Sequence, residues 1–179
     1  QGAAPAARAD RMNAAVASMP IPATQRWWQR CEDRLDLLSP RLNPLRHLGS
    51  IAMLMFWVLL ASGVYLYAAI DTSVSGAYAS IDRLSREQWW LGGILRSVHR
   101  YAADLFVLCT LLHLLREWVL GRFRGFRRMT WWTGTALLPL LMVSAIGGFW
   151  LNWDQLGQYS AIATAEWLDW WPLFATPFT

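Results

Sequence analysis

The stretch "RSVHRYAADLFVLCTLLHLLREW", residues 96–118, decides how the rest of the sequence is interpreted. It is apolar enough to enter a membrane, yet it contains His99, His113 and several ionisable residues. An ionised side chain costs at least about 2.5 kcal/mol near the centre of a bilayer. A helix that keeps these groups therefore has a use for them.

The two histidines are 14 residues apart. In an α-helix this separation is a rise of roughly 21 Å, and both side chains lie on the same face. One metal ion cannot bridge such a distance. We therefore expect two separate ligand sites, one above the other across a membrane.

Three apolar runs, residues 49–70, 89–120 and 130–151, are long enough to cross a bilayer core of about 30 Å. The first and third carry no charge, and the second has charges toward both ends. The sequence predicts an all-α membrane protein with three transmembrane helices, at about 44–70, 89–120 and 130–151, in a bundle unit of residues 44–151. Pro139 should kink the third helix.

The flanking segments are of a different kind. Residues 1–22 are Ala-rich and lack the apolar core of a signal peptide, so we expect a mobile tail. Residues 23–43 have apolar residues at helical spacing between charges, which predicts an amphipathic helix on the membrane surface. A helix packed on protein fits that pattern equally well. Residues 152–179 are expected to form a surface helix on the outer side.

The composition excludes several classes of protein. All 16 basic residues are arginine, and they flank the apolar runs, so a nucleic-acid-binding function is not expected despite the net charge of +4. Cys31 and Cys109 lie far apart and form neither CxxC nor CxxCH. That spacing argues against zinc, an iron–sulfur cluster and covalent haem attachment.

Four glycines repeat the spacing of the histidines. Gly49 and Gly63 in the first span are 14 residues apart, as are Gly134 and Gly148 in the third. Glycine lets a flat ring approach a helix backbone closely, and imidazole is a common axial ligand of haem iron. Taken singly, each feature is also explained by helix packing or an interhelical hydrogen bond. Together they favour two flat cofactors stacked in a bundle.

Charged residues accompany the histidines. Arg96 and Arg116 each lie three residues from a histidine, where they could pair with haem propionates. Arg100 and Asp104 are four residues apart and could pair with each other. A role of Asp104 in proton transfer is the alternative.

Four motifs, "ILRSVHR", "LLHLLREW", "MTWWTG" and "WLNWDQLGQYS", together resemble the N-terminal part of cytochrome b. The sequence is most similar to the short, split cytochrome b of plastid and cyanobacterial quinol–plastocyanin reductases, from about residue 28 to 172. The resemblance implies a four-helix bundle with two non-covalent haems b. His99 would bind the iron of the outer-side haem and His113 that of the inner-side haem.

The resemblance also implies roles for other residues. The propionate-binding arginines would be Arg96, Arg100 and Arg116, and the haem-contact glycines would be Gly49, Gly63, Gly134 and Gly148. Residues 152–172 would form part of an outer quinone pocket.

Three departures from the family pattern matter. The family takes the second axial ligand of each haem from a fourth helix, which we expect from further sequence or from another chain. The family's "PWxQ" turn is "NWDQ" here, so the shape of the outer pocket stays open. His47 aligns with the cysteine that attaches an extra haem in the plastid protein. We expect His47 to cap the first membrane helix, with a non-covalent ligand role as the alternative.

The principal hypothesis is an electron-transfer subunit of a quinol-oxidising cytochrome bc-type complex, with quinone as substrate and with a Rieske iron–sulfur protein and a cytochrome c as partners. The alternative is a dihaem membrane anchor of another quinone-linked oxidoreductase without a Rieske partner. A cofactor-free assembly protein is a third possibility, which a colourless purified protein would support. The expected location is the bacterial inner membrane or another energy-transducing membrane.

The arginines predict the orientation. Five lie in the segment from residue 23 to the first span, and four lie between the second and third spans: Arg26, Arg30, Arg34, Arg41, Arg46, Arg122, Arg124, Arg127 and Arg128. The other connection is nearly balanced in charge, and no basic residue follows Arg128. We expect a cytoplasmic N-terminus. Cysteines introduced at positions 80 and 124 test this: an outside reagent should label 80 only, and labelling of 124 alone would reverse the topology.

Overall fold

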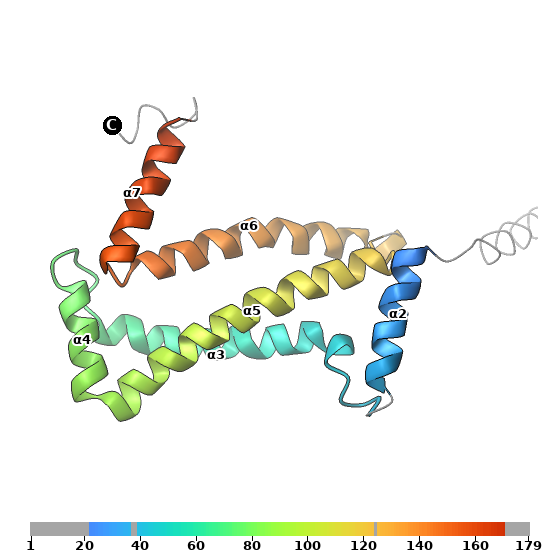
Figure 1. Ribbon diagram of the computed structural model, residues 1–179, viewed down its shortest axis with the longest axis horizontal. Helices are drawn as coiled ribbons and strands as arrows, with labels where there is room; N and C mark the ends of the chain where they lie inside the picture. Colours follow the sequence, from blue (N-terminus) through green and yellow to red (C-terminus); the bar gives the residue numbers. More distant parts are fainter. Residues whose placement is uncertain (1–21, 37–38, 124, 171–179) are drawn as a thin grey trace, which may run out of the picture.

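The computed structural model describes residues 22–36, 39–123 and 125–170, and these contain six α-helices and no strand. Three long helices run along the molecule, with shorter helices across its ends (Figure 1). The helices are α2 (Ala23–Asp36), α3 (Leu48–Ala69), α4 (Ala77–Glu87), α5 (Ile94–Val119), α6 (Arg128–Trp150) and α7 (Gln155–Asp169). The 3₁₀ turns η1 (Pro44–Arg46) and η3 (Gly125–Arg127) and the π-helix η2 (Trp89–Gly93) connect them.

The centre of the fold is the antiparallel pair α3 and α5, which contact each other more extensively than any other two helices. Small side chains on both helices permit this approach, because Ala52 and Ser62 of α3 and Ala102 of α5 are buried. Every charged residue of this pair is on α5, since α3 has none. The pair therefore combines an apolar helix with the helix that carries the candidate ligands.

Helix α2 closes one end of this pair. Trp28 is 5% exposed and packs with Leu48, Ala52 and Cys109 in the main apolar cluster. The chain then returns toward α3 through Asn43, whose side chain accepts a hydrogen bond from the backbone of Leu45. Helix α2 thus packs on protein through Trp28 and Glu32, while Arg30 and Asp33 are exposed. The expected helix over 23–43 ends at Asp36 in the described structure, and most of the expected tail, residues 1–22, lies outside it.

Two helical stretches are long and apolar enough to cross a membrane by length and composition: Leu48–Ala69 and Gly125–Trp150. These coincide with two of the three expected spans. Helix α5, which falls in the second expected span, residues 89–120, is long enough but is not one of these two stretches. Helix α6 continues through Pro139 without a break.

Helix α4 is absent from the sequence prediction, which treated residues 71–88 as a connection. Its buried residues Ala77, Ser80, Ile81 and Leu84 follow helical spacing, so the amphipathic signal was present in the sequence. The hydroxyl of Ser80 accepts from the backbone N–H of Asp71 at 3.0 Å. Because Ser80 is only 7% exposed, it is a poor labelling site for the topology experiment.

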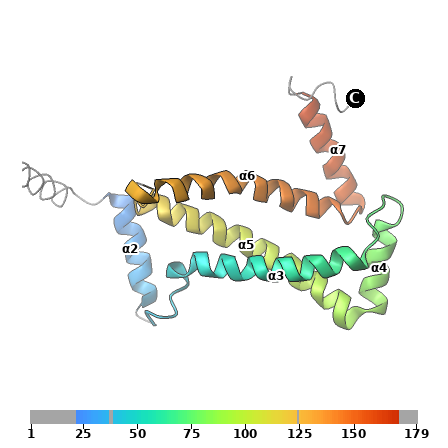
Figure 2. The same ribbon diagram turned by 180° about the vertical axis from the view of Figure 1, so that it is seen from behind.

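Exposed positions suit that experiment better. Ser75 precedes α4 and Arg122 follows α5, and both are exposed. They replace Ser80 and Arg124, of which the latter lies outside the described residues. The two connections lie at opposite ends of the molecule, as the view from behind also shows (Figure 2).

Helix α7 extends away from the end of α6 (Figures 1 and 2). The "NWDQ" segment makes the bend: Trp153 has φ 46°, and the side chain of the N-cap residue Asp154 accepts from the backbone N–H of Gly157 at 2.7 Å. A non-glycine residue at positive φ is uncommon. The bend therefore depends on a local cap that compensates an unfavourable backbone conformation.

Candidate functional site

Each candidate histidine on α5 faces a candidate glycine on α3. A Cβ atom added to Gly63 would lie 3.2 Å from Cε1 of His99, and one added to Gly49 would lie 3.1 Å from Cε1 of His113. The helices are antiparallel, so two equal intervals of 14 residues bring both pairs together at once. The structure thus creates two imidazole–glycine contacts, separated along α5 by roughly 21 Å.

His99 has a hydrogen-bond partner that determines which ring nitrogen carries its proton. Nδ1 of His99 lies 2.9 Å from Oγ of Ser62. When the hydroxyl of Ser62 donates to the carbonyl oxygen of Val58, which lies 2.6 Å away, its oxygen accepts from His99. Nδ1 is then the protonated nitrogen, and Nε2 keeps the lone pair that a metal ligand needs. A partner on the second nitrogen is usual for ligating histidines.

The other two candidate glycines have no such neighbour. A Cβ at Gly134 or Gly148 would have no atom within 4 Å among the described residues. Helix α6 contains no buried residue, and side chains such as Leu140 and Val143 are more than half exposed. The structure therefore brings the histidines together with the α3 glycines and leaves the α6 glycines open.

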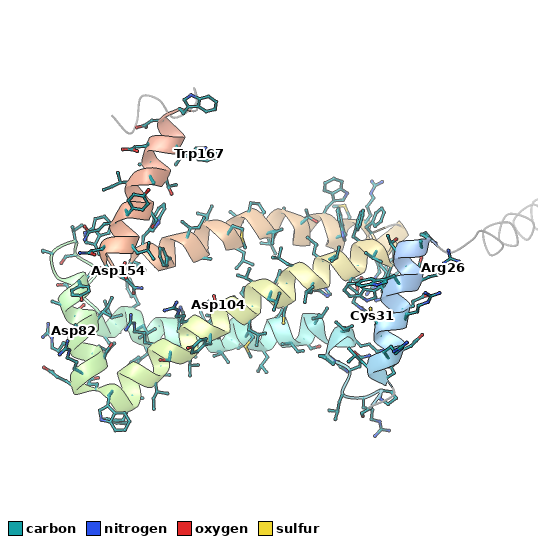
Figure 3. All side chains as sticks on the ribbon, in the orientation of Figure 1. Arg26, Cys31, Asp82, Asp104, Asp154 and Trp167 are labelled. Carbon is teal, nitrogen blue, oxygen red and sulfur yellow. The ribbon has the colours of Figure 1, made fainter. Side chains whose placement is uncertain are left out.

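The charged residues near His99 lie at the end of the molecule that contains α4. Nη1 of Arg96 donates to Oγ of Ser85 at 3.2 Å, which ties α5 to α4. Arg100 and Asp104 are both exposed and form no ion pair with each other in the described structure. Asp104 lies midway along the bundle (Figure 3). The proposed i, i+4 pairing of these two residues is thus not formed, and both side chains are available for other partners.

Arg116, near His113, belongs to a buried polar cluster. Its Nε donates to Oε1 of Glu32 on α2 at 2.7 Å, and both side chains are 10% exposed. Nε1 of Trp28 donates to the same oxygen at 2.7 Å. Burial raises the pKa of Glu32, but the hydrogen bonds from Arg116 and Trp28 outweigh burial and hold that pKa below its ordinary value. Glu32 is therefore ionised at neutral pH.

Two buried polar atoms on the candidate helices lack a partner in the described residues. One is Oγ1 of Thr110 on α5, and the other is the indole Nε1 of Trp131 at the start of α6. Unpaired buried donors are rare in folded proteins, so each calls for an acceptor. A haem propionate is a suitable acceptor for an indole N–H. Trp131 lies at the end of the bundle near His113, and His99 lies at the opposite end, so they belong to two separate candidate haem sites, each with its own imidazole–glycine contact.

His47 is exposed, immediately before α3. It occupies the N-cap position of that helix, but its side chain makes no capping hydrogen bond. The expectation of a capping histidine is therefore right about position and wrong about the interaction.

Sequence reasoning did not identify three residues of this site. Ser62 and Ser85 are unremarkable serines until the fold places them beside His99 and Arg96. Glu32 lies 84 residues from Arg116, so no local spacing could have paired them. These contacts join residues of different helices, so they follow from the packing of α2, α3 and α4 against α5 and not from local spacing.

The open glycines permit a sharp test of cofactor packing. Gly148→Leu should lose haem, because a bulky side chain there would meet a ring packed against the backbone. Gly147→Leu is the matched control, since neither position has an atom within 4 Å of a new Cβ in the described structure. The Gly147→Leu variant should keep its haem. Haem per chain in the membrane-inserted protein is the measurement, and full haem in both variants would assign these glycines to helix packing only.

A comparison with protein families agrees with this geometry. The family model described as cytochrome b/b6/petB matches residues 35–178, four fifths of the chain, which include α3 to α7. Proteins of this family are integral to membranes, bind haem and transfer electrons within multi-subunit redox complexes of the bc type. Such a match over most of the length, with the ligand-type histidines on one helix face, identifies the relationship. The chain belongs to the cytochrome b family.

Proposed function

We propose that this chain holds two haems b, one at His99 and one at His113, and transfers electrons between quinol or quinone and partner redox subunits of a bc-type complex. The observation that carries the proposal is the double contact of His99 with Gly63 and of His113 with Gly49. Two equivalent ligand positions at different depths are what electron transfer across a bilayer of about 30 Å requires. When bound, each haem iron accepts and releases one electron.

The chain's own residues would hold the cofactors in defined ways. Nε2 of His99 is oriented as a ligand by the Nδ1–Ser62 hydrogen bond, and His113 would provide the corresponding ligand at the inner side. Arg96, Arg100 and Arg116 would neutralise propionates, and Gly134 and Gly148 of α6 would let the ring planes approach from the second side. Apolar side chains of α3 and α6 would exclude water.

We further propose the arrangement in the membrane. The end with α2 and the arginine-rich connection 121–129 would face the cytoplasm, and the end with α4 and α7 would face the outside. Arg26 and Cys31 mark the first end in Figure 3, and Asp82 and Asp154 mark the second. Residues 152–172 would contribute to an outer quinone pocket, near partners such as a Rieske iron–sulfur protein and a cytochrome c.

Removing each ligand tests the assignment. His99→Ala should remove the outer-side haem and His113→Ala the inner-side haem, because each imidazole is one axial ligand of one iron. Reduced-minus-oxidised spectra of the intact complex, with haem quantified per chain, distinguish the two losses. His47→Ala is the control and should retain both haems, since His47 is exposed and outside the helix pair. Two normal haems in both ligand variants would refute the assignment.

The second axial ligands lead to a separate prediction. The 179 residues contain three histidines, and only two lie on the bundle helices, so bis-histidine ligation of two haems needs two more. We propose that they come from a fourth helix, in further sequence or another chain, with histidines about 13 to 15 residues apart to match the rise of roughly 21 Å on α5. That helix would cover the exposed face of α6.

Expression of residues 1–179 alone tests this idea. We expect low or unstable haem content, which co-expression of the fourth helix should restore. Two stable, six-coordinate, low-spin haems in the isolated monomeric chain would contradict it.

A further inference from the structure

Glu32 is an acidic residue buried at the end of a membrane bundle. It lies on α2, outside the region that the family model matches, yet only 8% of its surface is exposed. Buried carboxylates are rare unless they are paired. Its position therefore requires a partner, and in the described structure its one salt bridge is to Arg116.

The carboxylate of Glu32 is held from several directions. Its Oε1 accepts from Nε1 of Trp28 and from Nε of Arg116, each at 2.7 Å. Nδ2 of Asn43, which is 1% exposed, donates to the backbone oxygen of Glu32 at 2.9 Å. Trp28 in turn belongs to the apolar cluster of α3 and α5. Glu32 is thus held in one place, and a fixed acceptor can hold the long, flexible side chain of Arg116 in one orientation.

Arg116 keeps donors available beyond this pair. A guanidinium has five N–H groups in a planar fork. Arg116 uses Nε for Glu32 and Nη1 for Glu117, the latter at 3.3 Å, while Nη2 has no hydrogen-bond partner in the described residues. One turn separates Arg116 from His113. The guanidinium can therefore hold Glu32 and a further anion near His113 simultaneously.

Glu117 is a weaker influence on Arg116 than Glu32 is. Its carboxylate also lies 3.1 Å from Arg122 and 3.9 Å from Arg127, so it is shared among three cations. The contact of Glu32 is shorter and more buried than the Glu117 contact. The orientation and the effective charge of Arg116 consequently depend mainly on Glu32.

We propose that Glu32 is a positioning residue for the inner-side haem, acting through Arg116. It directs the guanidinium edge toward the His113 site and offsets part of its positive charge. A negative charge nearby disfavours addition of an electron, so Glu32 lowers the reduction potential of that haem. This inference rests on the proposed function, because it requires a haem at His113.

Glu32→Gln tests the inference with the least disturbance, because the amide keeps an acceptor at the same place and removes only the charge. Potentiometric titration of the intact complex should show an easier reduction of the inner-side haem, by about tenfold in the equilibrium constant. That is about 59 mV for a one-electron couple, the size expected for one unit charge about 12 Å from the iron at an effective dielectric of about 20. The outer-side haem should titrate as before.

Two further variants separate positioning from a simple charge effect. Asp33→Asn removes the same charge from an exposed residue of α2 and should leave both potentials unchanged. Arg116→Gln should be non-additive with Glu32→Gln, since Glu32 acts through that arginine. Additive shifts, an equal shift in Asp33→Asn, or an unchanged potential in Glu32→Gln would each overturn the inference.

Haem content separates this inference from the proposed function. Fewer than two haems per chain in the unmodified complex would contradict the proposed function itself. With two haems present in the unmodified complex, loss of the inner-side haem alone in Glu32→Gln would support the positioning role. Loss of both haems would overturn it, because Glu32 would then serve only folding.

Discussion

The contact of two imidazoles with two glycine backbones determines how α3 and α5 pack. His99 and His113 need space on the neighbouring helix, and Gly63 and Gly49 provide it at the same interval of 14 residues. A shift of α3 by one residue would rotate both glycines by about 100° and move them by 1.5 Å, so both contacts would be lost together. The register of the pair is thereby fixed at two points, and the positions of both candidate ligands along the helix pair follow from it.

Polar interactions gather at the two ends of this pair. At one end α2 brings Glu32 to Arg116, and at the other α4 brings Ser85 to Arg96. Each histidine thus has an arginine within one turn, and each arginine has a partner from a helix outside the bundle. The short terminal helices are therefore part of the candidate sites, since they decide where the guanidinium groups point.

The apolar surface of α6 has a different physical explanation. In water, exposed side chains such as Leu140, Val143 and Ile146 would form an apolar patch that promotes aggregation. In a membrane no such penalty exists, because lipid is as apolar as these side chains. Membership of a membrane-integral family therefore explains why these apolar side chains of α6 are exposed.

Periodicity and spacing in the sequence determined the helical class, the apolar runs of α3 and α6, and the shared face of His99 and His113, whereas the resemblance of four motifs indicated the family. These are local properties, because helix geometry converts sequence intervals directly into depth and direction. Helix α4 also had a local signal in its apolar spacing, which the surrounding polar residues obscured. Only the tertiary structure decided that Glu32 pairs with Arg116 and Ser62 with His99, and that Gly134 and Gly148 stay open. Those outcomes depend on how helices that are far apart in the sequence pack together. The spacing of residues within one helix does not predict which side chains of two helices will meet.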